Sequence, residues 1–229
     1  MPREGSIVLP GRTVTVRRRW LNGRVPTPSV PLVHPVHRFA HHEIDFRRRI
    51  VTMAVVNRTP DSFYDDGAGA VLLEAHEGQG TSADRGLLST DLNSDGQYRE
   101  LLYVDGGVST TGTAGQLRMQ GNLVFRHAVE KLAKTAHIAL DKAGLTAGEV
   151  DWLVPHQANA RIITATAQKM GLPMDKVVLT VADHGNTSAA SIPLALSVAD
   201  GEGRFAPGDV IVTEAIGGGL SWGSVVLRW

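Results

Sequence analysis

The sequence contains no cysteine among its 229 residues. This absence excludes disulfide bonds, thiolate ligands for metals and catalysis by a cysteine nucleophile within this chain. A run of about 18 apolar residues is also missing, so we expect no membrane-spanning helix. The N-terminus lacks the apolar segment of a secretory signal. A cytoplasmic protein is therefore the expectation.

An excess of charge of either sign is missing as well, because 23 Lys and Arg balance 23 Asp and Glu. The balance hides an asymmetry, since residues 1–50 hold ten arginines and only three acidic residues. Such a split is typical of a basic tail or of a segment with a separate origin. Four prolines, Pro26, Pro28, Pro31 and Pro35, interrupt any helix in this region. We therefore predict a basic, irregular N-terminal segment over residues 1–65.

Two features of this segment could suggest a ligand. Basic runs at residues 17–19 and 47–49 could contact nucleic acid, but no aromatic interleaving or recognisable module accompanies them. The histidines His34, His37, His41 and His42 have the spacing of half a metal site, without a second pair of ligands. We expect a solvated polar stretch that binds neither metal nor nucleic acid.

From about residue 70 the pattern changes to an alternation of strands and helices. Strand-like runs occupy residues 69–75, 87–96, 151–155, 177–181, 209–216 and 221–229, and helical spacing occupies residues 118–143, 157–170 and 188–200. The longest helix has an apolar stripe at Phe125, Val129, Leu132, Ala136 and Ala139 or Leu140, and Gly144 suits its end. This order predicts a layered α/β domain over residues 66–229, with a final hairpin on the sheet.

Three loops follow strand ends in this domain. They place His156 and Asn186 before helices, and three glycines at residues 217–219 between the last two strands. Loops at strand ends converge on ligands in layered α/β folds. A His and an Asn that converge there supply two neutral hydrogen-bond donors, which suit an oxyanion developing on a carbonyl.

Each of these residues also has a purely structural interpretation. A single histidine after a strand is more often structural than catalytic, and Asn186 could cap the helix that follows it. The glycines could form a tight hairpin without a ligand. They are not a phosphate-binding loop, because no helix with Lys-Ser/Thr follows them.

Together the loops carry a resemblance to a known family. The segments VDWLVPHQANARIITATAQKMG, DHGNTSAASIPLAL and EAIGGGLSWGSVVLRW closely resemble the C-terminal half of β-ketoacyl-acyl-carrier-protein synthase III. The resemblance runs from about Asp66 to Trp229 and includes DGAGAVLLEA, DRGLLSTDLNSDG and MQGNLVFRHAV. It implies a thiolase-like layered fold, present here as its C-terminal half only. It also implies an acyltransferase of fatty-acid initiation, which condenses acetyl-coenzyme A with malonyl-carrier protein as carbon dioxide leaves.

The resemblance further implies roles for individual residues. The family uses a Cys-His-Asn triad, in which the Cys is acylated and the His and Asn stabilise the enolate. His156 and Asn186 match that His and Asn. Gly218 matches the backbone donor to the acyl-Cys carbonyl, where glycine allows a close approach. No cofactor is implied, because coenzyme A thioester and carrier-protein phosphopantetheine are substrates.

Other positions match segments of the family that meet its substrates and the acyl carrier protein. Those matching the wall of the pantetheine tunnel are Met119, Gly121 and Phe125. For Phe125, packing in the core is the alternative. Those matching the segment that meets carrier protein or coenzyme A are Gln157, Ala158, Asn159, Ala160 and Arg161. Arg161 and Lys169 would offer positive charge to an acidic carrier protein.

The family's Cys lies in its N-terminal half, which has no counterpart in this chain. We therefore expect that the chain forms no acyl-enzyme and does not catalyse condensation. One face of the sheet should lack its normal partner, which predicts exposed apolar surface and self-association or instability. The family's homodimer interface uses the missing half, so we do not expect that homodimer here.

Residues 51–68, VTMAVVNRTPDSFYDDGA, resemble instead the N-terminal signature of dihydropteroate synthase, a TIM-barrel folate enzyme. Asn57 matches the asparagine that, in that family, contacts the pterin pyrophosphate through magnesium. The rest of the barrel is absent, so folate chemistry cannot be assembled. Because DDGAGA fits both families, our hypothesis is a fusion of two gene fragments joined near Asp66.

Three functions are compatible with these observations. The one we favour is an incomplete β-ketoacyl synthase III that is inactive in condensation. The alternatives are a non-catalytic module that binds acyl carrier protein or coenzyme A, and a fragment of dihydropteroate synthase.

Overall fold

The computed structural model divides the chain into two compact units, residues 1–51 with 74–76, and residues 52–73 with 77–229. Its described backbone comprises residues 5–9, 12–16, 36–39, 42–45, 50–51, 71–73 and 78–229, and its described side chains are those of Val71 and residues 78–229. The domain boundary predicted at residue 65 falls outside these ranges and stays a prediction.

The first unit contains short strands that the sequence did not indicate. β1 (Gly5–Leu9) pairs antiparallel with β2 (Arg12–Val16), and β3 (Val36–Phe39) pairs antiparallel with β4 (His42–Asp45). β5 (Ile50–Val51) also belongs to this unit. The segment predicted to be irregular therefore includes two regular strand pairs.

A mixed sheet of four strands, in the order β10-β11-β12-β7, organises the second unit. The strands are β7 (Gly86–Ser94), β10 (Trp152–Pro155), β11 (Val210–Gly217) and β12 (Ser221–Arg228). β10 runs parallel to β11, whereas β12 runs antiparallel to both of its neighbours. As a result β7, β10 and β11 end at the same edge of the sheet, and the loops after them are neighbours.

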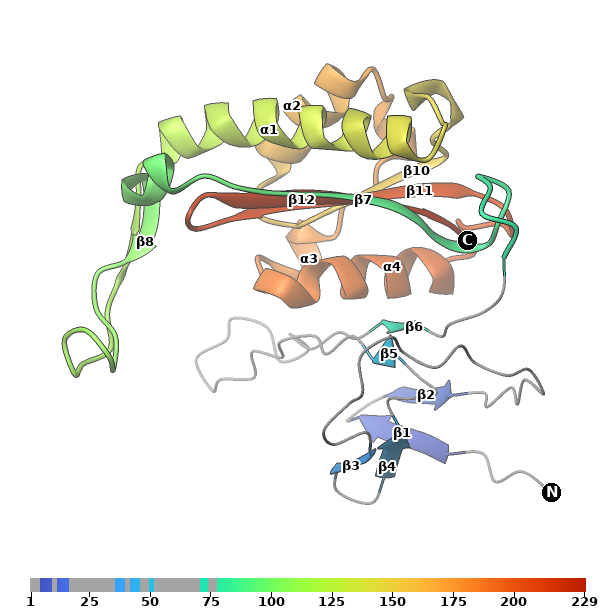
Figure 1. The fold of residues 1–229 in the computed structure, drawn as a ribbon, viewed down its shortest axis with the longest axis horizontal. Helices are drawn as coiled ribbons and strands as arrows, with labels where there is room; N and C mark the ends of the chain where they lie inside the picture. The colour runs from blue at the N-terminus through green and yellow to red at the C-terminus, as the bar shows by residue number, and fades with distance from the viewer. Residues whose placement is uncertain are drawn as a thin grey trace. The chain divides into compact units, whose positions relative to one another are not determined.

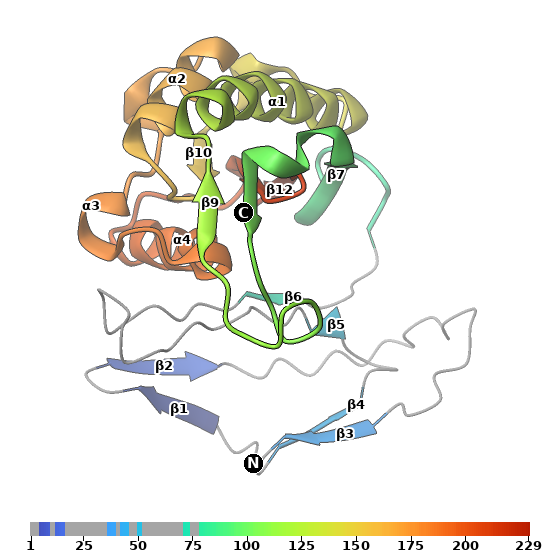
Figure 2. The same ribbon diagram turned by 90° about the vertical axis from the view of Figure 1, so that its left-hand side faces the viewer.

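Helices cover both faces of this sheet (Figures 1 and 2). α1 (Gly121–Lys142) and α2 (Ala160–Met170) lie on one face, and α3 (Val181–His184) and α4 (Ser191–Gly201) lie on the other. The layered α/β fold with a final hairpin is confirmed. Helices thus lie over both faces of this sheet, and the predicted exposed apolar surface is considered below with the edge strand.

α1 confirms the helix predicted over residues 118–143. Its buried residues are Val124, Ala128, Leu132, Ala133, Thr135, Ala136, Ala139 and Leu140. The predicted stripe differs at its N-terminal end, where Phe125 and Val129 are only half-buried. Gly144 follows the helix with a φ of +70°, a conformation that favours glycine.

α2 and α4 also confirm predicted helices, with different starts. α2 begins at Ala160 rather than residue 157, because the side chain of Asn159 accepts a hydrogen bond from the backbone N–H of Arg161 (2.9 Å) and caps the helix. It ends at Gly171, which has a φ of +75°. The helix predicted over residues 188–200 is the short 3₁₀ turn η4 (Ser188–Ala190) followed by α4.

Two apolar clusters hold the layers together, one on each face of the sheet. Side chains alternate between the faces of a strand, and β11 shows this directly. Val210 and Val212 join the cluster that includes α1 and α2, whereas Ile211 joins the cluster that includes α4. Both faces of β11 are thus buried, which explains why DVIVTEAI is apolar throughout most of its length rather than alternating.

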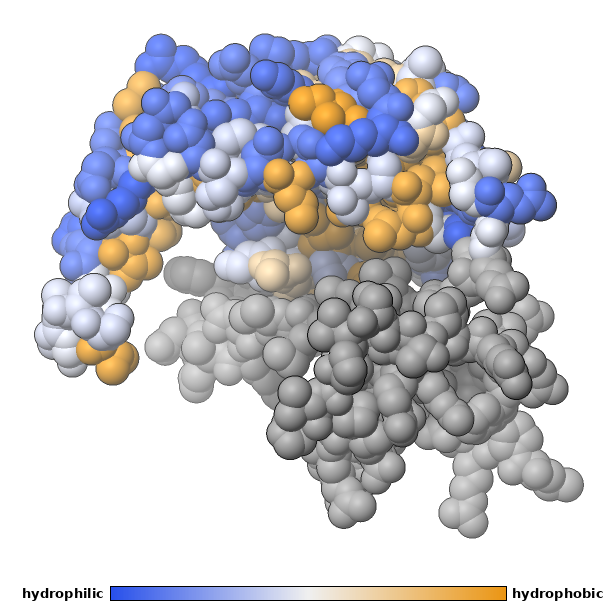
Figure 3. All heavy atoms as spheres, in the orientation of Figure 1, coloured by the Kyte–Doolittle hydropathy of each residue, from blue (hydrophilic) through white to orange (hydrophobic). Residues whose placement is uncertain are grey.

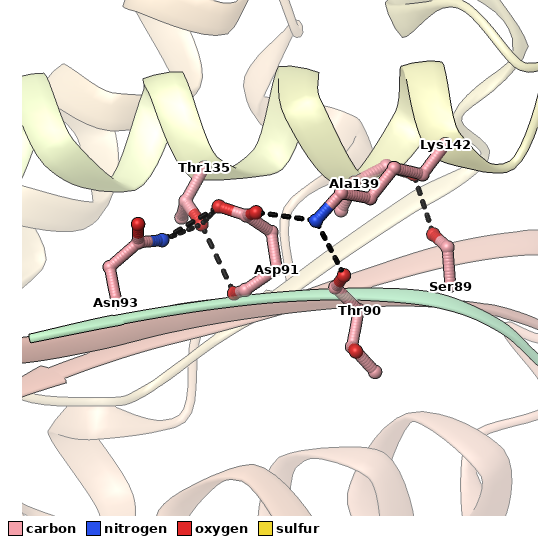
Figure 4. A network of polar contacts seen from close by, with 7 residues as sticks. All are labelled: Ser89, Thr90, Asp91, Asn93, Thr135, Ala139 and Lys142. Carbon is pink, nitrogen blue, oxygen red and sulfur yellow. Dashed lines mark hydrogen bonds and ion pairs between the residues drawn. The ribbon is translucent and has the colours of Figure 1, made fainter.

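β7, the edge strand, is fastened to α1 by polar contacts (Figure 4). The buried Asp91 carboxylate accepts hydrogen bonds from Thr135 Oγ1 (2.6 Å) and Lys142 Nζ (2.7 Å), and Asn93 Nδ2 donates to it at 2.7 Å. Burial alone would raise the pKa of Asp91, but these hydrogen bonds outweigh burial and hold the pKa below its ordinary value. Ser89 Oγ adds a hydrogen bond to the carbonyl oxygen of Ala139 (2.5 Å).

A projecting arm follows β7 (Figures 1 and 3). The 3₁₀ helix η1 (Gly96–Leu101) leads into a hairpin of β8 (Leu102–Val104) and β9 (Leu117–Met119). The exposed large apolar side chains among the described residues are Leu87 and Leu92 on β7, Val104, Val108, Leu117 and Met119 on the arm, and Leu179. Exposed apolar surface is therefore present on the arm and on β7, where Leu92 projects from the face of the sheet opposite the α1-facing Asp91.

Two predicted strands differ from the structure, and a third is only partly described. Residues 177–181 form a single bridge to β10, between Val177 and Leu153, because α3 begins at Val181. The strand predicted over residues 87–96 ends at Ser94, because Asp95 caps η1 and its side chain accepts a hydrogen bond from Gln97 N–H (3.0 Å). Within residues 69–75, the structure describes β6 (Leu72–Leu73).

Candidate active site

His156 lies directly after β10, at the sheet edge where the strand-end loops meet. Its backbone N–H donates to the carbonyl oxygen of Glu214 on β11 (2.8 Å), which continues the parallel ladder by one residue. Its side chain is half-buried. Burial lowers the pKa of His156 below its ordinary value of 6.5, because removal from water disfavours the charged ring. Burial therefore favours the uncharged form of the ring.

Ser191, the first residue of α4, holds the imidazole of His156. Its Oγ lies 2.6 Å from Nδ1 of His156 and also accepts a hydrogen bond from the backbone N–H of Gln157 (3.1 Å). Ser191 is fully buried. The first turn of α4 thereby fixes the ring orientation on the face of the sheet opposite α1.

Gln157 belongs to the segment that we predicted to meet carrier protein or coenzyme A, and its side chain has a structural role. The side chain is completely buried. Its Nε2 donates to the carbonyl oxygens of Pro155 (2.8 Å) and Val178 (3.1 Å), and its Oε1 accepts from the N–H groups of Thr180 and Val181. All of its hydrogen-bonding capacity is used inside the protein. It joins the loop after β10 to the loop that begins α3.

Asn186 lies in the loop between α3 and η4 and is exposed. Its Oδ1 accepts a hydrogen bond from the N–H of Ser188 (3.0 Å), which forms a turn just before η4, whose N-cap is Thr187. Its amide N–H groups have no partner among the described residues and remain available as donors. Within residues 78–229, no hydrogen bond joins the side chains of Asn186 and His156.

The loop around Asn186 contains buried polar atoms that lack partners within the described part of the chain. They are Thr180 Oγ1, His184 Nδ1 and Thr187 Oγ1. Buried polar atoms in folded proteins are nearly always hydrogen-bonded, so such a group in a working protein requires a partner.

The glycine turn at residues 217–219 connects β11 to β12. Gly217 pairs with Ser221 at the end of the hairpin, and Gly219 has a φ of +135°, which disfavours any other residue. A side chain at Gly218 would place its Cβ 2.9 Å from the carbonyl oxygen of Leu102. The turn is therefore a tight hairpin, as the structural interpretation held, and it also needs glycine for the close approach of β8.

The predicted partner-binding residues of α2 have different surroundings. Asn159 caps the helix, Ala158 is half-buried and Ala160 is exposed at its start. Arg161 is exposed, and its guanidinium lies over the ring of Phe125 on α1, 5.6 Å from the ring centroid. Lys169 is exposed in the last turn. Two cations of α2 thus remain accessible to a partner.

The residues predicted to line a pantetheine tunnel lie at the base of the arm. Met119 ends β9 and is 59% exposed, and Gly121 is the first residue of α1 and is also exposed. Phe125 is half-buried and contacts Arg161. The core-packing alternative for Phe125 is therefore only partly correct.

Sequence reasoning missed two residues that the structure places at this edge. Ser191 lies within SAAS, where nothing distinguished it from its neighbours. Glu214 is 1% exposed, and neither of its carboxylate oxygens has a hydrogen-bond partner within the described residues. Burial raises the pKa of Glu214 to about 8. An isolated acid in the apolar run DVIVTEAI was the available signal for it.

The described residues show neither a metal site nor a membrane span. Among the described side chains, no three His, Asp or Glu residues are grouped closely enough to hold a metal ion. No described helix combines the length and the apolar character required to cross a bilayer. The side chains of His34, His37, His41 and His42 lie outside the described residues, so the expectation about metal there stays a prediction.

Known proteins are similar to this chain over most of its described residues. Residues 140–229 match the family described as 3-Oxoacyl-[acyl-carrier-protein (ACP)] synthase III C terminal. The chain is 82% identical over 166 residues to a β-ketoacyl-[acyl-carrier-protein] synthase III of Paracoccus denitrificans, covering 72% of this chain and 51% of that protein. The corresponding protein of Rhodobacter capsulatus is 74% identical over the same coverage. The chain thus spans about half the length of the curated relatives it matches.

A solved structure agrees with these relatives. The 3-oxoacyl-(acyl carrier protein) synthase III of Pseudomonas aeruginosa PAO1 is 41% identical, with a TM-score of 0.63 over 70% of this chain and 48% of that one. The thiolase-like fold is therefore confirmed. The comparisons do not support the resemblance of residues 51–68 to dihydropteroate synthase, and Asn57 lies outside the described residues. Residues 140–229 thus match the C-terminal domain of β-ketoacyl-acyl-carrier-protein synthase III, and these relatives and the solved structure are similar to this chain over its C-terminal part.

Proposed function

We propose that this chain carries the His and Asn donors of a decarboxylating acyl-transfer site of fatty-acid initiation. Its substrate would be a malonyl thioester on an acyl carrier protein. The observation that carries the proposal is the imidazole of His156, which Ser191 holds one residue beyond the strand pairing with β11. The names of the relatives support the same class of chemistry.

In this proposal the two side chains act on the carbonyl oxygen of the thioester. The bond between the carboxylate carbon and the α-carbon breaks, carbon dioxide leaves, and the electron pair passes into an enolate. A neutral His156 N–H and the free amide N–H of Asn186 donate to the enolate oxygen as its charge develops. Without an acyl acceptor, the enolate takes a proton from water and yields an acetyl thioester.

Condensation needs an acyl group on a nucleophile, and the chain contains no cysteine. Our proposal is therefore that the isolated chain decarboxylates malonyl-carrier protein weakly and does not condense it with acetyl-coenzyme A. Gly218 would supply a backbone N–H for a second carbonyl, but that use requires an acyl-enzyme that this chain does not form alone.

A second candidate function is a binding module for carrier protein or coenzyme A without catalysis. It is favoured by the exposed Arg161 and Lys169, which lie on one short helix and present positive charge. Both candidates share the same surface on α2. They differ in whether carbon dioxide is released.

The experiment incubates the chain with malonyl-carrier protein and measures carbon dioxide release and the mass of the carrier protein. We expect acetyl-carrier protein to appear faster than without the chain, and His156→Ala to abolish the difference. His137→Ala, an exposed position on α1, is the matched control. Binding without release would favour the binding module, and equal rates for the chain and His156→Ala would refute the proposed site.

A second measurement tests the missing nucleophile. Intact mass after incubation with acetyl-coenzyme A should be unchanged, and a stable acetyl adduct would contradict the proposal.

The cytoplasmic location and the absence of the family's homodimer stay predictions.

A further inference from the structure

The hydroxyl of Ser191 has a single acceptor within reach among the described residues. That acceptor is Nδ1 of His156, 2.6 Å away. The other contact of the hydroxyl oxygen is with the backbone N–H of Gln157 at 3.1 Å. A backbone N–H can only donate, so the oxygen accepts there and keeps its own proton for another partner.

The opposite proton arrangement leaves a buried donor without a partner. If Nδ1 of His156 carried the proton and donated to Ser191, the oxygen would accept twice and its own proton would have no acceptor. Ser191 is 1% exposed, so bulk water cannot accept that proton. An unpaired buried donor keeps the full cost of losing its hydration. The arrangement with Ser191 donating to Nδ1 leaves no such group.

We propose that Ser191 is a positioning residue that selects the neutral tautomer of His156 with its proton on Nε2. The loss of a proton from Nδ1 makes that nitrogen the acceptor, and the proton on Nε2 makes the opposite side of the ring a donor. The catalytic value of this tautomer rests on the proposed function, in which His156 donates to a carbonyl oxygen. The tautomer itself follows from the hydrogen bonds alone.

Two backbone hydrogen bonds hold His156 and Ser191 in the positions that this tautomer requires. The N–H of His156 is fixed to Glu214 on β11, and the N–H of Gln157 is fixed to Ser191 on α4. The buried side chain of Gln157 holds the loop between them. The ring and the hydroxyl therefore face each other from rigid elements, which a tautomer-selecting contact requires.

The test is nitrogen NMR on the full chain with ¹⁵N-labelled histidine, at a pH above 7.5 where the ring is neutral. The protonated and unprotonated ring nitrogens of a neutral histidine resonate far apart, so their frequencies report the tautomer directly. Loss of one set of signals in His156→Gln assigns the residue. We expect His156 to have its proton on Nε2, and a proton on Nδ1 would overturn the proposal.

Variants then test the role of the hydroxyl. Ser191→Ala should lower the ratio of the two tautomers about fivefold, the effect of one ordinary hydrogen bond. Ser191→Thr keeps the hydroxyl and should restore the ratio, while Ser197→Ala, an exposed serine of the same helix, should leave it unchanged. An unchanged ratio in Ser191→Ala would contradict the proposal, and the wild-type spectrum decides if that variant does not fold. Failure of malonyl decarboxylation would count against the proposed function without altering these spectra.

Discussion

The backbone N–H of His156 donates to the carbonyl oxygen of Glu214, 2.8 Å away, so one hydrogen bond joins the candidate catalytic residue to β11. The same strand ends three residues later in the glycine turn. The position of His156 relative to that turn is therefore set by sheet register rather than by a long loop. A site built on strands is held more precisely than one built on loops.

Glu214 should make the stability of the chain fall as the pH rises. Its pKa is raised from 4.5 to about 8 by burial. An acid with a raised pKa contributes stability that is complete below its unfolded pKa and is lost as the pH rises through the folded value. The free energy of unfolding should therefore decrease between pH 4.5 and about 8, by up to a few kcal/mol. Urea unfolding at several pH values measures this decrease.

The variant Glu214→Gln should remove most of that decrease, because an amide does not ionise. Glu130→Gln, at an exposed position of α1, is the control and should keep it. A wild-type stability that is flat or increases across this range would mean that the carboxyl has a partner in solution.

Lys131 should contribute to the attachment of η1. Its Nζ lies 4.3 Å from the ring centroid of Tyr98 on η1 and 4.0 Å from that of Trp222 on β12. η1 has no buried residue, so contacts of this kind hold it in place. We expect Lys131→Met to lower the free energy of unfolding by about 1–2 kcal/mol and to alter Trp222 fluorescence.

Two further variants separate this effect from a general loss of charge. Lys131→Arg keeps a cation over both rings and should restore stability and fluorescence. Lys134→Met removes an exposed lysine one turn away and should change neither. Equal effects of Lys131→Met and Lys134→Met would rule out the contact with the rings.

Asp91 should give the chain an acid-sensitive attachment of β7. Hydrogen bonds from Lys142, Thr135 and Asn93 hold its pKa below 3.8 despite burial. Stability from such an acid is complete above its unfolded pKa and is lost as the pH falls through the folded value. Asp91→Asn should lower the free energy of unfolding at pH 7 by about 1–3 kcal/mol and flatten its decrease in acid. An Asp91→Asn variant with the wild-type free energy of unfolding at pH 7 and the wild-type decrease in acid would contradict the network.

Arg161 should be needed for binding of an acidic carrier protein. Arg161→Glu should weaken binding by about tenfold or more at low salt, because a cation on the contact surface is replaced by an anion. The loss of its contact with Phe125 should cost only about 0.5–1 kcal/mol of stability. Arg204→Glu, an exposed charge reversal elsewhere on the surface, is the control. Titration by calorimetry at two salt concentrations measures the affinity of each variant for the carrier protein. Similar affinities for Arg161→Glu and Arg204→Glu would show that α2 does not make the contact.

Periodicity predicted most of the second unit because its elements are long and strongly patterned. α1 and β11 bury long series of apolar side chains, so both elements could be predicted without knowledge of the turns. The prediction for residues 177–181 was wrong in extent because Gln157 caps the start of α3 from a distant loop. No local pattern indicates a hydrogen bond from 23 residues earlier in the chain.

The candidate site was predictable in position but not in its supporting contacts. His156 was located by its place after a strand, whereas Ser191 became visible only once α4 lay against β10. Gln157 was named only because it matches a segment that meets a partner, and the burial of its amide was not predicted. Glutamine has an amide that can satisfy four backbone groups, so a polar residue type does not by itself indicate exposure.

The close packing at Gly218 has a consequence for how such chains change over generations. A Cβ at this position would meet the carbonyl oxygen of Leu102 at 2.9 Å, so the fold alone forbids a side chain there. That constraint operates whether or not the turn ever binds a substrate. A lineage that had lost its enzyme activity would still retain this glycine as long as it kept β8 in place. Packing alone therefore accounts for glycine at position 218, so its presence does not indicate whether a chain is catalytically active.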